Sequence, residues 1–409
     1  MAALRYLTAG ESHGKALVGI LEGIPSGLRL TAQDIDRDLK RRQTGYGRGG
    51  RMTIEADHAE IFSGVRWGKT LGSPIAILIE NKDFKNWTKG MSPYSADEGS
   101  IPAITRPRPG HADLAGALKF AHKDIRNVLE RSSARETAMR VGLGAVAKKF
   151  LEEFHIMIGS FVLQIGGISI KGSRGKGVEG GSGQSFTVQD SNPRILESLF
   201  KKAEKSPVRC PDEETADKMM RLIDGAAKSG NSVGGVFLVF VTGVPAGLGS
   251  HTHWDKRLDG RLARGLMSIQ AIKAVEVGLG FGISERFGSD VMDEIFYSRR
   301  AGFFRKTNNA GGIEGGTTNG MPIVLSVAMK PIPTLRRPLR SVDIKTGKAV
   351  EAAYERSDIC AVPAAGVIGE AMAALTVADA FLEKFGGDSV EEVTRNYESY
   401  MNHVRQFSG

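Results

Sequence analysis

Residues 364–385, AAGVIGEAMAALTVADAFLEKF, and residues 232–242, SVGGVFLVFVT, decide what kind of fold this chain can adopt. The first stretch is a long run of small and apolar residues that predicts a helix, and Gly386 with Gly387 ends it. The second stretch is short and rich in Val and Phe, which predicts a buried strand. A long helix beside a buried strand favours a fold that mixes helices and sheet.

Further elements follow on both sides of these two. Capping boxes, in which a Thr or Ser precedes an acid by three residues, predict helices over residues 31–43, 133–151 and 389–407. Residues 211–228 and 258–275 are also predicted helices, and residues 75–79 and 323–330 are predicted strands. Residues 164–192 are rich in Gly and Ser, which predicts an exposed excursion. No break in composition divides the chain, so we predict one α+β domain over residues 1–409.

The composition limits the class of protein. Of the 409 residues, 41% are hydrophobic and 25% are charged, which is typical of a chain that buries a core. The longest apolar run, residues 236–241, is far shorter than the about 20 residues of a membrane helix, so we expect no membrane segment. The first ten residues lack the pattern of a signal peptide, and two cysteines are too few for a disulfide framework. We therefore expect a cytoplasmic protein.

The charge and glycine content point towards ligands. A net charge of +9 is compatible with two kinds of ligand: nucleic acid, or acidic small molecules bound in a cleft. Glycine, with 52 residues, is nearly twice as frequent as the usual share of about 7%. Much of this excess surrounds Arg, His and Ser, which suggests backbone that approaches ligands closely.

Five segments carry the candidate chemistry. They are residues 10–14 (GESHG), 41–51 (RRQTGYGRGGR), 106–113 (RPRPGHAD), 131–136 (RSSARE), and a C-terminal group at 308–320, 330–334 and 355–358. His13 can act as a general acid or base because imidazole titrates near neutral pH, although a hydrogen-bonded histidine in a tight turn explains it equally well. His111 follows two prolines that stiffen its loop, and a purely structural turn is the alternative.

The basic segments suit anionic ligands. Arginine forks bind phosphate and carboxylate, and Ser133 lies at a predicted helix N-terminus, where an anion is favoured. A solvated basic loop and a plain capping box are the alternatives for each segment taken alone. Together the segments predict a deep basic site with two histidines, suited to lyase, transferase or isomerase chemistry on an anionic metabolite. His251 and His253 have no third ligand at a suitable spacing, so we expect a surface turn and no metal site.

Ten motifs follow one another along the chain: GESHG, RRQTGYGRGGR, RPGHAD, RSSARETAMR, GVPAGLGS, MSIQAIKAVEVGLGF, NNAGGIEGG, TNGMPI, KPIPTL and ERSD. In these motifs and in their order, the chain resembles the chorismate synthase family from about residue 4 to residue 385. This resemblance implies a layered sandwich of helices and antiparallel sheets, assembled as a homotetramer. Residues from about 166 to 211 match no motif of the family, and we expect a variable surface excursion there.

The resemblance also implies a reaction. The family removes phosphate from 5-enolpyruvylshikimate 3-phosphate by an anti-1,4-elimination that gives chorismate, the last common step of the shikimate pathway to aromatic amino acids. Reduced FMN is implied as the cofactor, although the net reaction is redox-neutral. Whether NADPH serves as the reductant stays open.

Residue roles follow from the same resemblance. His13 resembles the histidine that protonates the departing phosphate, His111 resembles the one beside the flavin, and Asp358 with Ser12 resembles a relay that takes a proton from flavin N5. The positions implied to face the substrate are Arg42, Arg48, Arg51, Arg108 and Arg135. The positions implied to contact FMN are Arg131, Ser132, Ser133, Gln270, Ala271, Gly315, Lys330, Pro331, Ile332, Pro333, Thr334 and Arg356. Many members carry Asn at position 270, so the side-chain contact of Gln270 is in question whereas a backbone contact is retained.

Two other functions stay open. The high pI and the GYGRGGR loop are compatible with a nucleic-acid-binding protein, although Tyr46 is the one aromatic residue interleaved there. The second alternative is a flavin-binding protein without the lyase activity.

Overall fold

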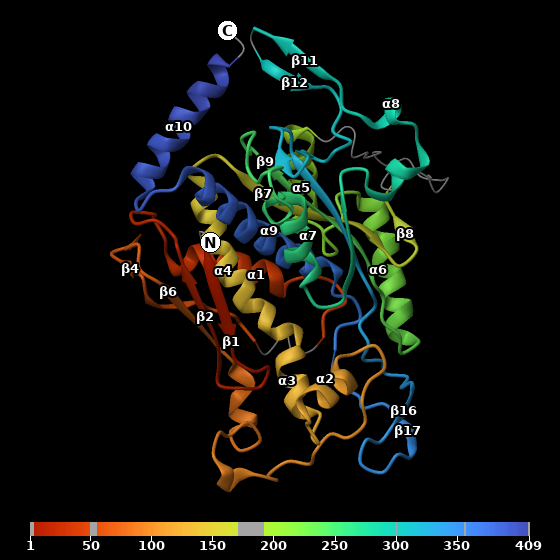
Figure 1. Ribbon diagram of the computed structural model, residues 1–409. Coiled ribbons are helices and arrows are strands. Elements are labelled where there is room, and N and C mark those ends of the chain that lie inside the picture. Colours follow the sequence, from red (N-terminus) through yellow and green to blue (C-terminus); the bar gives the residue numbers. More distant parts are fainter. Residues whose placement is uncertain (1–3, 50–54, 171–191, 300, 356, 408–409) are drawn as a thin grey trace.

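Two antiparallel sheets face each other across a layer of helices (Figure 1). The computed structural model describes residues 4–49, 55–170, 192–299, 301–355 and 357–407. The smaller sheet has the order β1 (Arg5–Ala9), β2 (Ala16–Glu22), β6 (Ile75–Glu80) and β3 (Glu60–Ser63). The larger sheet has the order β10 (Ile272–Val277), β15 (Ile323–Met329), β9 (Gly235–Thr242), β7 (Met157–Ile165) and β8 (Ile168–Ser169). The expected α+β class is confirmed, as are the strands predicted over residues 75–79, 232–242 and 323–330.

Three helices form the layer between the sheets: α1 (Ala32–Gln43), α4 (Thr137–Glu152) and α9 (Val362–Phe385). α4 packs on the smaller sheet, where Gly19 makes room for Met139, because an added Cβ would lie 2.5 Å from the Met139 Sδ. Gly144 of α4 permits close contact with α9, because a Cβ there would lie 2.4 Å from the Cβ of Ala371. α9 is long and apolar enough to cross a membrane, but 89% of its apolar window is buried inside the protein, which marks it as the core helix of the sandwich.

A buried ion cluster ties this helix layer to the larger sheet. Glu370 of α9 is fully buried and accepts hydrogen bonds from Arg41 at 2.7 and 2.8 Å, Lys148 at 2.8 Å and Ser160 at 2.7 Å. Burial alone would raise the pKa of Glu370, but the positive charges of Arg41 and Lys148 hold that pKa well below its usual range. Arg41 is therefore used inside the fold, whereas its neighbour Arg42 lines the pocket described below.

Two of the predicted helices have different bounds. Within residues 133–151, Ser133 accepts a hydrogen bond from the Arg135 backbone N–H at 3.3 Å and begins a short 3-10 turn, η4 (Ala134–Glu136), before α4 starts. The helix predicted over residues 258–275 is wrong in its second half, because α7 (Leu258–Met267) ends and β10 follows. A helix cannot run through residues 268–275, because Ala271, directly before β10, has a left-handed φ of +66°.

The remaining predicted helices lie outside this layer. α6 (Glu213–Lys228) and α10 (Val390–Gln406) confirm the helices predicted over residues 211–228 and 389–407. α5 (Pro193–Ala203) packs on β7 and buries Leu196 and Leu199, so this part of the excursion expected over residues 166–211 belongs to the core instead. Residues 171–191 of that excursion lie outside the described residues.

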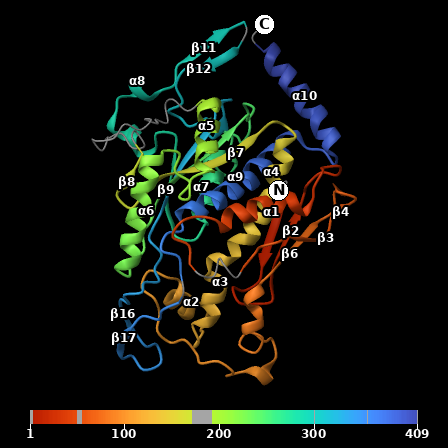
Figure 2. The same cartoon turned by 180° about the vertical axis from the view of Figure 1, so that it is seen from behind.

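A lower lobe has its own small hydrophobic cluster (Figure 1, Figure 2). α2 (Asp113–Phe120) and α3 (Arg126–Ser132) bring Ala117, Ile125 and Leu129 together, and Ile104 and Ile344 pack against them. The hairpin of β16 (Arg340–Val342) and β17 (Ala349–Glu351) lies beside these helices in both views. The shorter elements are β4 (Val65–Arg66), β5 (Lys69–Thr70), η2 (Lys82–Asn86), η3 (Ser95–Asp97), η6 (Trp254–Lys256), η7 (Gly280–Glu285), α8 (Gly288–Val291), β11 (Ile295–Ser298), β12 (Gly302–Arg305), β13 (Ile313–Glu314) and β14 (Thr317–Thr318).

Candidate active site

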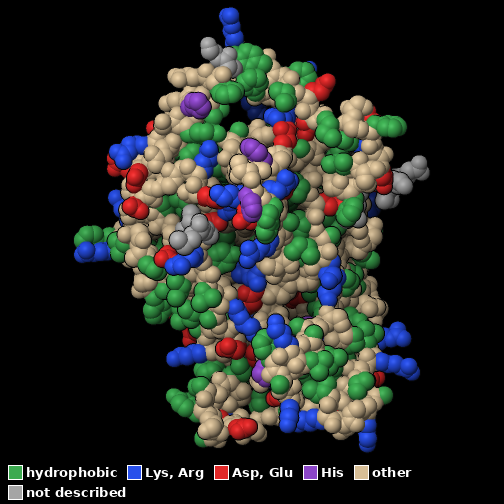
Figure 3. Space-filling model, viewed as in Figure 1, with side chains coloured by type: hydrophobic (Ala, Val, Ile, Leu, Met, Phe, Trp, Pro, Cys, Tyr) green, Lys and Arg blue, Asp and Glu red, His purple; other side chains and the backbone are tan. Residues whose placement is uncertain are grey.

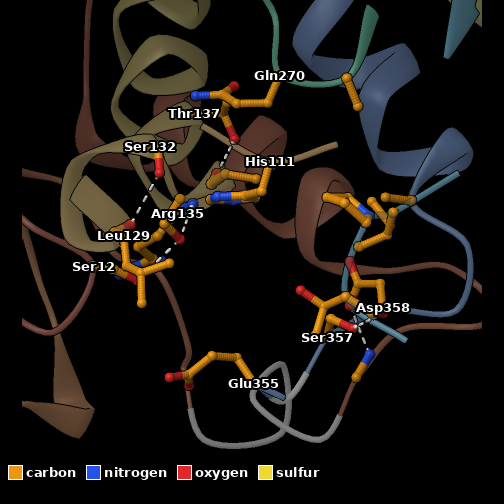
Figure 4. A pocket seen from close by; sticks show the side chains of 18 of the residues that line it. Ser12, His111, Leu129, Ser132, Arg135, Thr137, Gln270, Glu355, Ser357 and Asp358 are labelled. Carbon is orange, nitrogen blue, oxygen red and sulfur yellow. Dashed lines mark hydrogen bonds between the residues drawn. The ribbon is translucent and has the colours of Figure 1, made fainter. Parts of the chain in front are cut away.

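A pocket of about 1070 Å³ lies where the lobe meets the sandwich. Its walls come from segments far apart in sequence: the turn after β1, the end of α1, the junction of α3 with α4, and loops near residues 110, 270, 330 and 357. Pockets for small ligands usually span about 300–1,000 Å³, so this one is at the upper end of that range. Figure 4 shows polar side chains from several of these segments facing a common space.

The GESHG segment is the turn that joins β1 to β2. Gly10 has a φ of +105°, and a Cβ at this position would lie 2.4 Å from the Ala16 carbonyl oxygen, so the turn requires glycine. The side chain of Asn81 donates to the carbonyls of Glu11 at 3.1 Å and Gly14 at 2.8 Å, which fixes the turn. Asn81 also accepts from Arg135 Nε at 2.8 Å and thereby joins this turn to the basic part of the pocket.

His13 lies in this turn with a carboxylate behind it and a ring beside it. Its Nδ1 lies 2.8 Å from Glu130 Oε1, and its backbone N–H donates to Glu130 Oε2 at 2.7 Å. The indole of Trp87 stacks on the imidazole at a tilt of 31°, with ring centroids 4.2 Å apart. Burial would raise the pKa of Glu130, but hydrogen bonds from His13 and its positive charge when protonated hold that pKa below its usual range.

His111 has a carboxylate of its own. Its Nδ1 forms a short hydrogen bond with Asp113 Oδ1. Arg108 donates from its backbone N and its Nε to Asp113 Oδ2, both at 2.9 Å, and from Nη1 to Thr334 Oγ1 at 2.8 Å. Burial would raise the pKa of Asp113, yet the hydrogen bonds of His111 and Arg108 hold it well below its usual range. The pocket therefore contains two histidine–carboxylate pairs.

Among the described residues, five arginines line the pocket, and three of them, Arg42, Arg48 and Arg135, form a cluster. Arg42 and Arg135 share the fully buried carboxylate of Asp57, at 3.5 Å and 2.5 Å, and Arg48 lies on the same side of the pocket. Burial and the charges of Arg48 and Arg135 together lower the pKa of Arg42 to about 10, although the attraction of Asp57 opposes them. A cluster of cations that repel one another is stabilised when a multiply charged anion binds between them.

The four candidate residues Ser12, Ser133, Arg48 and Asp358 form two separate pairs. Ser12 Oγ donates to Ser133 Oγ at 3.0 Å, whereas Asp358 pairs with Arg48 Nη1 at 2.9 Å and accepts from the Gly49 N–H at 2.7 Å. Figure 4 shows Ser12 and Asp358 on opposite sides of the pocket. A proton relay between Ser12 and Asp358 would therefore have to cross the space that a ligand fills.

The remaining wall fits a flat aromatic cofactor. Ile269, Met329, Ile332 and Pro333 give it an apolar surface, and most residues expected to contact FMN lie in this pocket: Ser132, Ser133, Gln270, Ala271, Lys330, Ile332, Pro333 and Thr334. The amide oxygen of Gln270 is buried and has no hydrogen-bond partner among the described residues, so it can accept from a bound molecule. Ala271 keeps its strained left-handed backbone at this wall, as residues at ligand sites often do.

Three expected residues lie elsewhere, and two cannot be placed. Arg131 donates to the carbonyls of Thr8 at 2.8 Å and Gly10 at 3.2 Å, outside the pocket. Gly315 lies in the turn between β13 and β14, and Pro331 is exposed. Arg51 and Arg356 lie outside the described residues.

Several residues of the site were not predicted from the sequence: Glu130, Asp113, Asn81, Asp57, Trp87 and Arg126. Glu130 directly precedes the RSSARE segment and Asp113 ends RPRPGHAD, so both carried a signal by position. Nothing in the sequence marks Trp87 or Asp57.

On the face seen in Figure 3, basic side chains are mixed with acidic and apolar ones.

Comparisons with known proteins give a consistent result. The sequence model of the family described as chorismate synthase matches residues 4–382. The chorismate synthase of Aquifex aeolicus (strain VF5) is 57% identical over 404 residues, covering 99% of both chains. That of Geobacter sulfurreducens is 54% identical over 411 residues, covering 99% of this chain and 100% of the relative. A crystal structure titled as chorismate synthase superposes with a TM-score of 0.77 at 48% identity, covering 98% of each chain.

Proposed function

Since this chain belongs to the chorismate synthase family and is a carbon–oxygen lyase, we propose that it converts 5-enolpyruvylshikimate 3-phosphate into chorismate and phosphate with bound reduced FMN. One observation supports this most directly. A single pocket of about 1070 Å³ combines an arginine cluster, two histidine–carboxylate pairs and an apolar wall. A trianionic substrate and a flavin together need all three.

The arginines bind and orient the substrate, which carries two carboxylates and a phosphate. Arg42 and Arg135 are held at a fixed spacing by Asp57, and Arg108 is held by Asp113 and Thr334. Guanidinium groups fixed in this way lose little freedom when they bind an anion. Arg48 gives up its partner Asp358 or shares it when the substrate binds.

His13 assists the departure of phosphate. The C3–O bond breaks with its electron pair on the phosphate, and His13 gives a proton to a phosphate oxygen. The C6 hydrogen leaves as a proton that Asp358 or His111 can accept. The electrons of the C6–H bond form a double bond between C6 and C1, and the existing C1=C2 double bond moves to C2=C3, where the phosphate has left. Protonation of a leaving group by a positioned imidazolium contributes about 10²–10⁴-fold to a rate.

The residues that would hold FMN are Ser132, Ser133, Gln270, Ala271, Lys330, Ile332, Pro333 and Thr334. The chemistry that reduced FMN supplies when bound is transient electron donation, which eases phosphate loss and leaves no net oxidation. His111, charge-balanced by Asp113, and Asp358 are the groups of this chain that can hold a proton beside it.

The decisive test is anaerobic incubation of the protein with the substrate and chemically reduced FMN. Chorismate and phosphate should form in equal amounts, and omission of reduced FMN should abolish both. Tight FMN binding without product would favour a flavin protein of another activity. Nucleic-acid binding at low salt that weakens steeply with added salt, without turnover, would favour the nucleic-acid alternative.

Three further properties belong to the same proposal. Oxidation of NADPH by the protein with FMN under anaerobic conditions would show that it reduces its own flavin, and absence of oxidation would make it dependent on an external reductant. Light scattering should give the mass of a homotetramer. Fractionation of the cells that make the protein should recover it in the cytoplasm.

A further inference from the structure

One carboxylate is placed behind His13. The Glu130 side chain is 3% exposed, and each of its oxygens has a partner on His13: Oε1 the ring Nδ1 at 2.8 Å, and Oε2 the backbone N–H at 2.7 Å. Because a backbone N–H can only donate, Oε2 must accept there. The orientation of the carboxylate is thereby fixed, and Oε1 faces the ring, with Arg126 Nη1 at 3.5 Å from the same oxygen.

We propose that Glu130 is a positioning residue that makes His13 a proton donor through its Nε2 atom. This inference rests on the proposed lyase function of the same site. An ionised carboxylate at Oε1 accepts the Nδ1 proton, so the transferable proton of the charged ring is the one on Nε2. The carboxylate also balances the positive charge that the ring must carry before it protonates phosphate.

The other groups around the ring agree with this role. Trp87, from the segment after η2, stacks on the imidazole, and such a face favours a cation. Arg126 lies 4.9 Å above the same indole and contacts Glu130 at 3.5 Å and Glu355 at 3.4 Å. Asp83 also lines the pocket. Glu130 stays ionised in these surroundings, because His13 and Arg126 hold the pKa of Glu130 below its usual range although burial would raise it.

Substitution of Glu130 by Gln removes the negative charge of the side chain and keeps its shape. A Gln side chain has one oxygen and one NH₂ group, so it cannot accept from both the backbone N–H and the ring Nδ1–H of His13. The backbone N–H keeps the oxygen, and the NH₂ group faces Nδ1. Nδ1 must then accept, which holds the ring neutral with its proton on Nε2. Glu130→Asp keeps the charge and both oxygens.

The protonation of His13 can be read without substrate or flavin. In ligand-free protein with ¹⁵N-labelled histidine, NMR should show the wild-type His13 with a protonated Nδ1, and His13→Gln identifies its signals. In Glu130→Gln, Nδ1 should become an unprotonated acceptor. The matched control is Asp113→Asn, which alters the corresponding pair at His111 and should leave the His13 signals unchanged. An unchanged His13 spectrum in Glu130→Gln would overturn the proposal.

Turnover supplies the second readout. Glu130→Gln should lower kcat on the order of 10²-fold with little change in KM, because a whole general-acid contribution is lost while the arginines remain. The basic limb of the pH–rate profile should move to lower pH, and Glu130→Asp should recover most of the rate. A rise in KM at constant kcat would contradict the role. If wild-type protein makes no chorismate but its NMR pattern is as described, then the lyase function fails and the tautomer assignment survives.

Discussion

Arg135 donates from Nη1 to Oδ1 of Asp57 at 2.5 Å, inside the protein and behind the pocket. Arg42 contacts the other oxygen of the same carboxylate at 3.5 Å. Asp57 thus sets the distance between two guanidinium groups before any ligand arrives. The spacing of these two pocket arginines is therefore set by a residue that does not line the pocket.

Replacement of Asp57 by Asn should therefore weaken both folding and substrate binding. Loss of one partner of a buried ion pair leaves the other charge uncompensated, so we expect the free energy of unfolding to fall on the order of 3 kcal/mol. The KM for the substrate should rise, because the two arginines lose their fixed spacing. Urea unfolding and steady-state kinetics measure the two effects. Asp255→Asn, which breaks an exposed pair with His253, is the control and should change neither.

Replacement of Arg48 by Ala should act mainly on substrate binding. A hydrogen bond to a charged group contributes about 1.5–3 kcal/mol, so KM should rise about 10- to 100-fold while kcat falls much less. Arg48→Lys keeps the charge but loses the forked guanidinium, so its KM should lie between those of the wild type and Arg48→Ala. A variant with normal KM and depressed kcat would instead place Arg48 in the chemical step through its partner Asp358.

Replacement of His13 by Ala should act on turnover. The loss of a general acid lowers kcat roughly 10²-fold or more, whereas substrate binding should largely survive because the arginines are untouched. Single-turnover kinetics and equilibrium binding separate the two quantities. His403→Ala, on the outer helix α10, provides a control without contact to the pocket. Full activity of His13→Ala would refute its assignment.

Stability should fall in acid because of Glu370. Its pKa in the folded protein lies below the ordinary value of 4.5, so in the window below about pH 4.5 the unfolded chain takes up a proton that the folded chain does not. Such a group stabilises the fold fully above that window and progressively less as the pH falls, by roughly 1.4 kcal/mol per pH unit. Urea unfolding between pH 7 and pH 3.5 measures this slope.

Glu370→Gln should be less stable at pH 7. Below about pH 4.5, its free energy of unfolding should also fall less steeply with pH than that of the wild type. If this variant does not fold, Glu204→Gln provides a milder test, because Glu204 also pairs with Arg41 and Arg209 and its pKa is also lowered. An acid slope equal to that of the wild type in both variants would exclude this buried cluster as its source.

The elements that the sequence predicted well are those whose cause is local. The capping box of Thr31 and Asp34 and the small apolar residues of α9 each specify an element within a few neighbours. The prediction failed at residues 268–275, where a left-handed Ala271 turns an apparently helical stretch into β10. Alanine is a strong helix former, so only the surrounding tertiary structure can impose that backbone.

The same division holds for the site. The candidate histidines and arginines could be found because the glycines that mark them are their neighbours in the sequence. Glu130 could not be paired with His13, because the two are 117 residues apart and meet only when α3 packs beside the β1–β2 turn. Asp57 lies between Arg42 and Arg135 by the same kind of packing. Residues that orient other side chains can thus be identified only from the three-dimensional structure.

The stack of Trp87 on His13 gives this protein an internal optical probe. The chain has three tryptophans, and Trp67 and Trp254 are 87% and 78% exposed. Replacing those two by Phe would leave one indole, at the wall where a ligand must arrive. Its emission would then report occupancy of the pocket in real time, so the order in which the proposed flavin and substrate enter becomes measurable by stopped-flow fluorescence.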